Sequence, residues 1–246
     1  MLNSFTFAGV SSREFGVYIS GSGRITVPEK AYDFQQIPGR SGDLIVHRAA
    51  RVNNELITYP AFIAPTNDRG VLRPYPEMVS KLRAWLLSVR GYAVLTDSYD
   101  CEHYRMAAFA GPITFESLPD LSAGSFEIPF NCKPQRYLQD DVGAFSLSAF
   151  ESLTVDAGCR RFSEPLIIVT GTGSFTVGGK TITIADNSLT GPIYIDARIM
   201  DCYDSNGVNA NRFVSFSDYE FPVIEDGTVI NAGAVDLEVK PRWYEL

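Results

Sequence analysis

The stretch EPLIIVTGTGSFTVGGKTITI, residues 164–184, has the pattern of three short β-strands separated by two turns. Its segments PLIIVTG, SFTVGG and TITIA are rich in β-branched residues and are bounded by Gly or Pro, which is typical of strands. Gly178-Gly179 predicts a tight turn between the last two segments. Short strands joined in this way predict a small β-sandwich for the C-terminal part of the chain.

The same pattern extends in both directions from this stretch. Short segments rich in β-branched and aromatic residues, bounded by Gly, Pro, Asn or Asp, predict further strands. These segments are FTFAGV (5–10), GVYIS (16–20), DLIVHRA (43–49), ELITYPAFIA (55–64), YAVLTD (92–97), RMAAFAG (105–111), SFEIPFNC (125–132), PIYIDAR (192–198), NRFVSFS (211–217) and AVDLEVKP (234–241). The predicted fold class is therefore mainly β.

One segment, PYPEMVSKLRAWLLSVRG at residues 74–91, has helical periodicity instead. Pro76 precedes its apolar stripe and Gly91 follows it, as is common at the start and the end of a helix. The spacing predicts an amphipathic helix of about three and a half turns with one face packed on a core. The side chains of the stripe are Met78, Val79, Leu82, Trp85, Leu86 and Val89.

A domain boundary is predicted near Asp140. The stretch from Lys133 to Pro165 interrupts the succession of strands and contains no helical pattern. We expect a domain of strands plus one helix over residues 1–140 and a β-sandwich over residues 141–246. Within the C-terminal PRWYEL, Trp243 and Tyr244 are candidates to pack back on the first domain.

Composition and charge exclude several classes of protein. The 246 residues are 45% hydrophobic and 20% charged, which is sufficient for a packed core. The net charge of −8, from 29 acidic and 21 basic residues, disfavours binding to phosphate backbones and to anionic membranes. The sequence has neither a basic leader followed by an apolar run nor a segment long enough to span a bilayer. We expect a soluble product made in the cytoplasm.

The four cysteines Cys101, Cys132, Cys159 and Cys202 lie far apart and form no C-x-x-C pair. This pattern predicts reduced, mostly buried thiols of a cytosolic product. Cys101-Glu102-His103 has a metal-like spacing, because alternate side chains of a strand share one face. A second ligand pair is missing, since His47 is the only other histidine. A strand with a mixed polar face is therefore favoured over a zinc site.

Two glycine-containing motifs are candidates for phosphate or nucleotide sites. IPGRSGDL, Ile37 to Leu44, lacks the Lys-Ser/Thr ending of a phosphate loop and precedes a strand, so no helix N-terminus is available to hold an anion. It predicts a bend between strands, with Arg40 as an exposed contact residue of unknown partner. GTGS at Gly171 to Ser174 fails as a dinucleotide fingerprint, because Thr176 occupies the third glycine position.

Catalytic machinery is not predicted. G-x-S-x-G is absent, and only His47 and His103 could serve as a base, so a hydrolase is disfavoured. The carboxylate pairs Asp140-Asp141 and Asp100 with Glu102 are interpreted as solvated faces, since a glycosidase also needs a substrate cleft.

DCYDSNGVNAN, Asp201 to Asn211, is rich in oxygen ligands and suggests calcium. It departs from the EF-hand spacing because Tyr203 occupies the third position, and Asn206-Gly207 already predicts a turn. No catalytic, cofactor-binding or metal-binding residue is therefore predicted, and no cofactor is expected.

Several segments taken together resemble the distal tail protein family of long, non-contractile-tailed bacteriophages and related prophages. The resemblance spans nearly the whole chain. Its most specific elements are the FAGVSS opening at residues 7–12, the Pro-Gly-Arg-x-Gly turn, the Phe-x-Cys-x-Pro strand end and the terminal Pro-Arg-Trp. The segments are FTFAGVSSREFGVYI, IPGRSGDL, FEIPFNCKPQRYL, EPLIIVTGTGSFTVGGKTITI, IYIDARIMDCYDSNGVNAN and VKPRWYEL.

The resemblance implies a structural protein of the virion tail tip and not an enzyme. An N-terminal belt domain would assemble into a homo-hexameric ring, and a galectin-like β-sandwich would follow it. The ring would join the tail tube protein to the tail tip or baseplate proteins and let DNA pass, without specific nucleic-acid binding and without a membrane partner. Assembly would take place in the bacterial cytoplasm. Since a basic lining would bind DNA, we expect the channel face to be acidic or neutral.

The alternative function is a carbohydrate-binding module that contacts the host cell wall. Sugar sites generally need an exposed aromatic platform with polar neighbours, which Tyr194, Tyr203 and Tyr219 could supply. Alternation along short strands predicts instead that such residues pack in the core. The chain is short for the family and has no large insertion that would indicate an added sugar-binding module.

Overall fold

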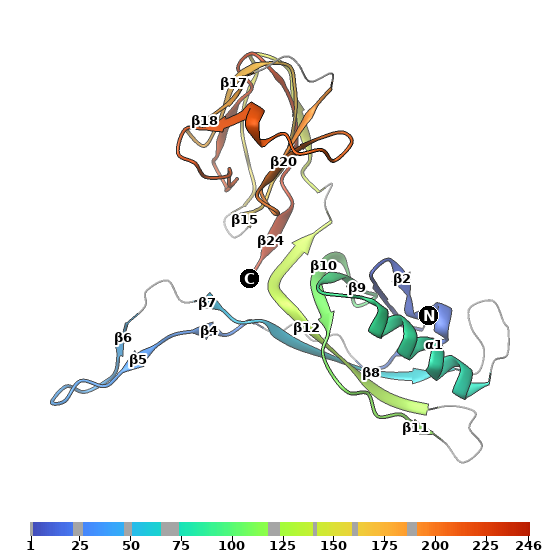
Figure 1. The fold of residues 1–246 in the computed structure, drawn as a ribbon. Coiled ribbons are helices and arrows are strands. Elements are labelled where there is room, and N and C mark those ends of the chain that lie inside the picture. The colour runs from blue at the N-terminus through green and yellow to red at the C-terminus, as the bar shows by residue number, and fades with distance from the viewer. Residues whose placement is uncertain are drawn as a thin grey trace. The chain divides into compact units, whose positions relative to one another are not determined.

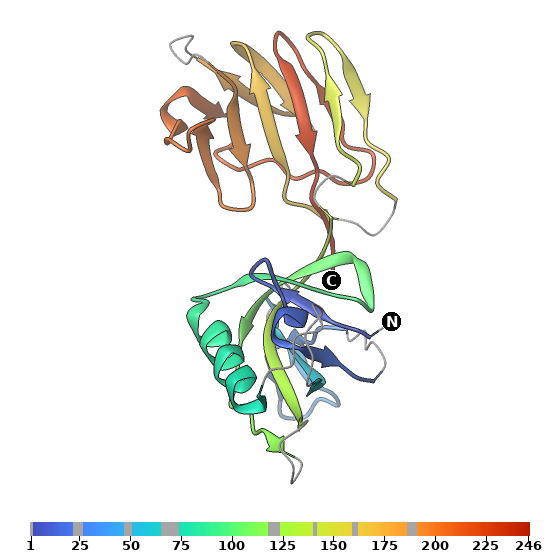
Figure 2. The same ribbon diagram turned by 90° about the vertical axis from the view of Figure 1, so that its right-hand side faces the viewer.

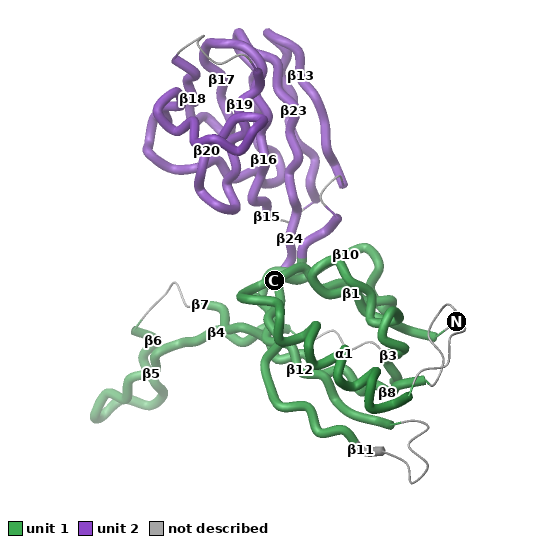
Figure 3. The backbone as a smooth tube through the Cα atoms, turned by 45° about the vertical axis from the view of Figure 1, so that its right-hand side comes forward, with its two compact units in different colours: residues 1–136, 246 green, residues 137–245 purple. Residues whose placement is uncertain are grey.

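The computed structural model describes residues 2–21, 27–46, 51–64, 74–117, 124–139, 142–158, 162–185 and 191–246. The chain divides into two compact units, which Figure 3 distinguishes by colour. Residues 1–136 with Leu246 form unit 1, and residues 137–245 form unit 2. Each unit has its own cluster of buried apolar side chains. Asp140, where the boundary is predicted, lies outside the described residues.

Unit 1 contains most of the longer strands and the α-helix (Figure 1). Its elements are β1 (Phe5–Phe7), β2 (Val10–Ser11), the 3-10 helix η1 (Ser12–Phe15), β3 (Val17–Ile19), β4 (Lys30–Ala31), β5 (Phe34–Gln35), β6 (Leu44–Ile45), β7 (Arg51–Val52), β8 (Glu55–Ile63), α1 (Tyr75–Ser88), β9 (Ala93–Asp97), β10 (Asp100–Phe109), β11 (Glu116–Ser117) and β12 (Gly124–Leu138). The last two residues of β12 belong to unit 2.

The sheet of unit 1 has the order β12-β10-β9-β1-β2, and β8 pairs with both β12 and β3. Along β8 every second side chain is buried, including Tyr59, Ala61 and Ile63. This period of two is what a strand with one covered face requires. The covered face packs against α1, which lies across the sheet in Figures 1 and 2.

Helix α1 confirms the predicted apolar stripe. Met78, Leu82, Trp85 and Leu86 are buried, and Val79 and Val89 pack partly against the same core. Trp85 stacks on Phe5 and Phe15, with ring centroids 5.8 and 4.7 Å away. The helix is held mainly by this packing, since it has no side-chain N-cap hydrogen bond.

A two-stranded extension leaves the sheet of unit 1 between β3 and β8 (Figure 1). We call residues 27–46 and 51–54 the arm. β4 pairs with β7 near its base, and β5 pairs with β6 near its tip, where Phe34 lies opposite Ile45. The predicted strand DLIVHRA is confirmed only over Leu44–Ile45 of β6. His47 and Arg48 lie outside the described residues.

Unit 2 contains the remaining elements. They are β13 (Phe145–Leu147), β14 (Ser152–Thr154), β15 (Phe162–Ser163), β16 (Leu166–Thr170), β17 (Gly173–Val177), β18 (Lys180–Ile184), β19 (Ile193–Asp196), β20 (Asp201–Asp204), the 3-10 helix η2 (Asn211–Phe213), β21 (Val214–Phe216), β22 (Val229–Asn231), β23 (Asp236–Lys240) and β24 (Trp243–Glu245).

Two antiparallel five-stranded sheets form unit 2, in the orders β13-β23-β16-β19-β20 and β14-β22-β17-β18-β21. Both contribute to one core, which includes Ile167 and Val239 of the first sheet and Phe175, Ile182 and Ile230 of the second. The predicted β-sandwich and the mainly β fold class are therefore confirmed. Gly178 and Gly179 both have positive φ, 58° and 81°, as the predicted turn between β17 and β18 requires.

Candidate interaction surfaces

The arm exposes apolar side chains along its length. None of residues 27–46 is buried, and the exposed fractions of Val27 and Phe34 are 86% and 62%. A two-stranded ribbon is at best marginally stable by itself, so such a ribbon commonly gains a covering surface in an assembly. The large exposed apolar residues are Val27, Phe34, Ile37, Leu44, Ile45 and Val46.

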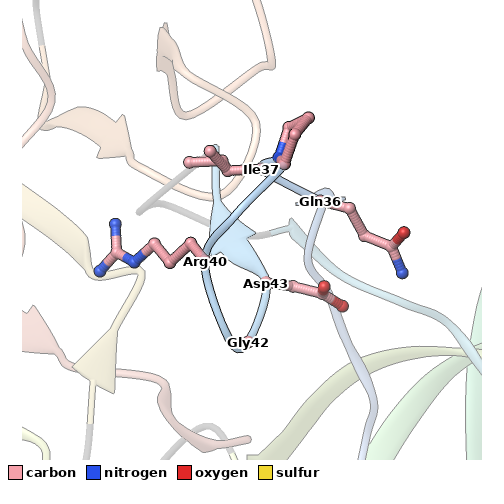
Figure 4. A pocket seen from close by; sticks show the side chains of 6 residues that line it. Gln36, Ile37, Arg40, Gly42 and Asp43 are labelled. Atoms are coloured by element: carbon pink, nitrogen blue, oxygen red, sulfur yellow. The ribbon is translucent and has the colours of Figure 1, made fainter.

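IPGRSGDL forms the tip of the arm between β5 and β6, which confirms the predicted bend between strands. The Arg40 amide donates to the Ile37 carbonyl at 3.2 Å, and Gly39 and Gly42 have φ of 80° and 84°. Figure 4 shows the Arg40 and Asp43 side chains pointing away from each other. The hollow at this tip is lined only by exposed residues, so it offers little desolvation to a ligand.

The base of the arm is fixed by polar contacts with the sheet. The Asn54 side-chain amide donates to Tyr92 Oη at 2.6 Å and to Asn131 Oδ1 at 2.7 Å. Arg105 forms an ion pair with Glu55, the first residue of β8. These contacts set the direction in which the arm leaves the sheet, because they hold Asn54, the last residue of the arm, and Glu55, the first residue of β8.

The face of the sheet opposite α1 is open in unit 1. Leu56, Thr58 and Pro60 of β8 alternate with buried residues and are exposed, and the exposed fraction of Leu56 is 67%. Their cross-strand partners on β12 are Asn131, Pro129 and Glu127. Glu127 is the only charged residue of these six. We call these six residues the open face.

The candidate metal residues Cys101, Glu102 and His103 lie on β10, as the interpretation of a mixed polar strand face predicts. His103 Nδ1 lies 2.8 Å from Asp100 Oδ1, and Arg136 Nε donates to Asp100 Oδ2 at 2.7 Å. The Asp100 side chain is 30% exposed and Glu102 is exposed, so this pair lies on a solvent-accessible face, but the interpretation did not include the contact with arginine. It missed the arginine because Arg136 lies 36 positions away in the sequence and only strand pairing brings it close.

The Asp201–Asn211 stretch forms a strand and a turn in place of the suspected calcium loop. Asp201 Oδ1 accepts hydrogen bonds from the side-chain amides of Asn209 and Asn211 at 2.9 and 2.7 Å. Asp204 Oδ1 accepts the amides of Asn206 and Val208, which shapes the predicted Asn-Gly turn. Among the residues described, no group of three or more His, Cys, Asp or Glu side chains is placed to hold a metal ion.

The three candidate sugar-stacking tyrosines do not form one platform. Tyr194 and Tyr203 are cross-strand partners whose rings stack at 5.4 Å, so one face of each ring covers the other. Tyr219 lies on a separate turn after β21 and has an exposed fraction of 95%. The expected core packing is wrong for all three, since Tyr194 and Tyr203 are only partly buried. Alternation along β19 in fact places Tyr194 on the outer side of the sheet, because its neighbours Ile193 and Ile195 are the buried residues.

Two further observations concern the helices and the cysteines. None of the helices within the described ranges has the length and apolarity that crossing a bilayer requires. The thiols of Cys101, Cys132 and Cys202 are free, with Cys101 exposed and the other two buried. Cys159 lies outside the described residues.

The fold is similar to that of known phage tail proteins. SPP1 Dit (gp 19.1), described as a paradigm of the hub adsorption apparatus of phages that infect Gram-positive bacteria, matches with a TM-score of 0.68 and 11% identity, over 100% of this chain and 99% of that chain. Two structures of the activated phage P2 baseplate also match. The one with Ca has a TM-score of 0.55 and 11% identity, over 98% of both chains.

The P2 baseplate structure with Sr has a TM-score of 0.58 and 10% identity, over 97% of this chain and 98% of that chain. No protein-family model and no curated protein sequence matches the chain. At 10–11% identity these structural matches establish a shared fold.

Proposed function

We propose that this chain is a structural, non-enzymatic distal tail protein of a long, non-contractile-tailed bacteriophage or prophage. In this role it forms a homo-hexameric ring that joins the tail tube protein to the tail tip or baseplate proteins. The single observation that carries the proposal is the match to SPP1 Dit over essentially the full length of both chains. Unit 1 would be the ring-forming belt domain, and unit 2 the galectin-like domain.

The arm is the proposed ring contact. A closed ring needs two different complementary surfaces on each subunit, and the apolar arm supplies one of them. Its described residues contain three acidic and three basic side chains, so the arm is neutral in a chain of net charge −8. A neutral, apolar arm can approach a like-charged second copy without repulsion.

The open face is the proposed channel lining. Its six residues include one anion, Glu127, and no cation that would bind phosphate groups. Lys133, the next residue on the same side of β12, has its Nζ over the Tyr92 ring. Six chains of net charge −8 would also disfavour adhesion of DNA to the ring. DNA would therefore pass without being held.

Light scattering of the purified full chain tests the proposal. We expect a mass of six times the 27.1 kDa of one chain, stable over a range of concentrations. The double substitution Phe34→Asp and Ile45→Asp places two charges on the exposed cross-strand pair of the arm. We expect it to give folded monomers with an unchanged circular dichroism spectrum, because neither side chain packs in the core.

Val208→Asp is the matched control, since it adds a charge at another exposed apolar residue, 61% exposed, in unit 2. It should leave the mass at six chains. A wild-type chain that stays monomeric at high concentration contradicts the ring, and a ring that survives both arm substitutions contradicts the role of the arm.

The carbohydrate-binding alternative is less well supported. Sugar rings stack on an open aromatic face, whereas Tyr194 and Tyr203 cover each other. A glycan array probed with the full chain tests it, and tight binding to one cell-wall glycan would favour this alternative.

A further inference from the structure

Tyr219 combines two features that are unfavourable for an isolated protein. Its side chain is 95% exposed, and its φ is 61°, in the left-handed region that favours glycine. A bulky aromatic residue gains neither burial nor an easy backbone conformation there. Asn or Gly would suit such a turn better. Phe150 and Met200 share both features, with exposed fractions of 83% and 71% and φ of 69° and 53°. What distinguishes Tyr219 is therefore the set of contacts that holds its turn.

The two neighbours of Tyr219 are held by a single lysine. Lys180 Nζ lies 2.7 Å from Asp218 Oδ2 and 2.7 Å from Glu220 Oε2. Hydrogen bonds with these carboxylates raise the pKa of Lys180, and the hydrogen bond with Lys180 lowers the pKa of Asp218. We call Lys180, Asp218 and Glu220 the bracket, because they hold the turn on both sides of the tyrosine.

Backbone contacts anchor the same turn to β18. The Ser217 amide donates to the Thr181 carbonyl at 3.0 Å, and the Thr181 amide donates to Ser217 Oγ at 3.1 Å. The Glu220 amide donates to Asp218 Oδ1 at 3.3 Å. The position of Tyr219 is therefore preorganised, which reduces the entropy that a partner must overcome on binding.

We propose that the tip formed by Asp218, Tyr219 and Glu220 is an anchor for a different tail protein, which receives Tyr219 in an apolar socket bordered by Lys or Arg. Tyrosine is one of the residue types enriched among interface hot spots, which lie in well-packed pockets once the partner is bound. The inference rests on the proposed function, and it names the surface of unit 2 that a tail tip or baseplate partner contacts.

The shape and charge of the tip identify the kind of partner. Sugar sites are concave with several convergent polar groups, whereas Tyr219 is 95% exposed and offers one ring. The two carboxylates against one lysine leave the tip with a net charge of −1, which complements a basic rim. A second copy of this chain carries a net charge of −8 and fits less well.

Site-specific photocrosslinking in assembled particles tests the inference. The photoreactive residue p-benzoylphenylalanine replaces Tyr219 in the chain, particles are produced from the strain that encodes it, and adducts in purified tails are identified by mass spectrometry. The same replacement at Val208, also exposed, is the control. We expect an adduct between position 219 and a different tail protein that position 208 does not form.

Two variants separate anchoring from folding. Tyr219→Asn should melt at the same or a higher temperature and lower the amount of bound partner per tail about tenfold or more. Lys180→Met, which removes the bracket but keeps a long side chain, should lower the adduct yield from position 219 severalfold. A Tyr219→Asn chain that keeps its partner fully would overturn the inference.

The crosslinking outcomes also distinguish this inference from the proposed function. Tails that contain the chain but give no adduct at position 219, or an adduct only with a second copy or with cell-wall glycan, overturn the anchor and leave the proposed function standing. Absence of the chain from purified tails overturns the proposed function, and the anchor with it.

Discussion

Arg105 Nη1 lies 2.6 Å from Glu55 Oε2, and the exposed fractions of the two side chains are 14% and 6%. Glu55 is the first residue of β8 and directly follows the arm. A buried ion pair of this kind contributes little net stability by itself, but losing one partner leaves an uncompensated charge inside the protein. The pair therefore fixes Glu55, the first residue after the arm, to Arg105 of β10.

Arg105→Ala should lower the free energy of unfolding of the chain by about 3 to 5 kcal/mol, because it leaves the buried Glu55 carboxylate without its arginine. Urea unfolding followed by circular dichroism measures the change. Lys81→Ala, which removes an exposed ion pair with Glu77 on α1, is the control and should cost about 0.5 kcal/mol or less. Equal effects of the two substitutions would show that the buried pair is unimportant.

The stability of unit 1 should depend on pH because of Asp100. Burial alone would raise the pKa of Asp100, but hydrogen bonds from Arg136 and His103 outweigh it and hold that pKa below its ordinary value of 3.8. A carboxylate with a lowered folded-state pKa stabilises the fold above its unfolded pKa and loses that contribution as the pH falls below about 4. Wild type should therefore lose more stability between pH 6 and pH 3 than Asp100→Asn.

Urea midpoints at several pH values check this prediction. Arg136→Gln is the companion variant, since it removes the main hydrogen-bond donor of Asp100. Asp100→Asn should change the pH profile less in that background than in wild type. Identical profiles for wild type and Asp100→Asn would contradict the prediction.

The three described thiols should differ in reactivity. Burial raises the pKa of both Cys132 and Cys202 to about 12, so neither forms the reactive thiolate in the native protein at pH 8. Cys101 is exposed. Iodoacetamide at pH 8 should label Cys101 first, and peptide mapping should find Cys132 and Cys202 modified only after denaturant is added. Rapid native labelling of Cys132 would indicate that unit 1 opens readily.

Gly233→Ala should destabilise unit 2 strongly. Gly233 has φ of 56°, and a Cβ there would overlap the backbone carbonyl oxygen of Ser174 on β17. A backbone atom cannot move away as a side chain can, so we expect a loss of about 3 kcal/mol or more. Thermal unfolding gives the value.

Gly207→Ala is the matched control, because Gly207 also has positive φ, 76°, but a Cβ there meets nothing within 4 Å. Gly207→Ala should lower the free energy of unfolding by only about 1 kcal/mol, because alanine adopts a positive φ less readily than glycine. Equal unfolding temperatures for the two alanine variants would show that the close approach to Ser174 is not the reason for glycine at position 233.

The elements that could be predicted from sequence are those with a regular pattern of burial. The α1 stripe is periodic because one face packs on Phe5 and its neighbours, and β8 alternates because one face of the sheet is covered. Strands β4, β5 and β7 of the arm were not predicted. Their residues are exposed on both sides, so no alternation marks them.

The candidate interaction residues were only partly predictable for a related reason. Tyr219 is one of the three candidate sugar-stacking tyrosines, for which core packing is favoured from the sequence. The sequence also does not show that Lys180, 40 positions before Glu220, holds the neighbours of Tyr219. Contacts between distant positions depend on strand pairing, here of β18 with β21. Turn residues such as Tyr219 also lack the periodicity from which exposure is predicted.

The strands on either side of the arm are themselves paired, since Val17 lies opposite Ile63 and Ile19 opposite Ala61. The arm is thus one long excursion between two adjacent, antiparallel strands, and its length is not constrained by the sheet. Residues can be added to or removed from its two legs together while every pairing of the sheet is kept. The reach of the arm can therefore change, by evolution or by design, without any change in the sheet from which it extends.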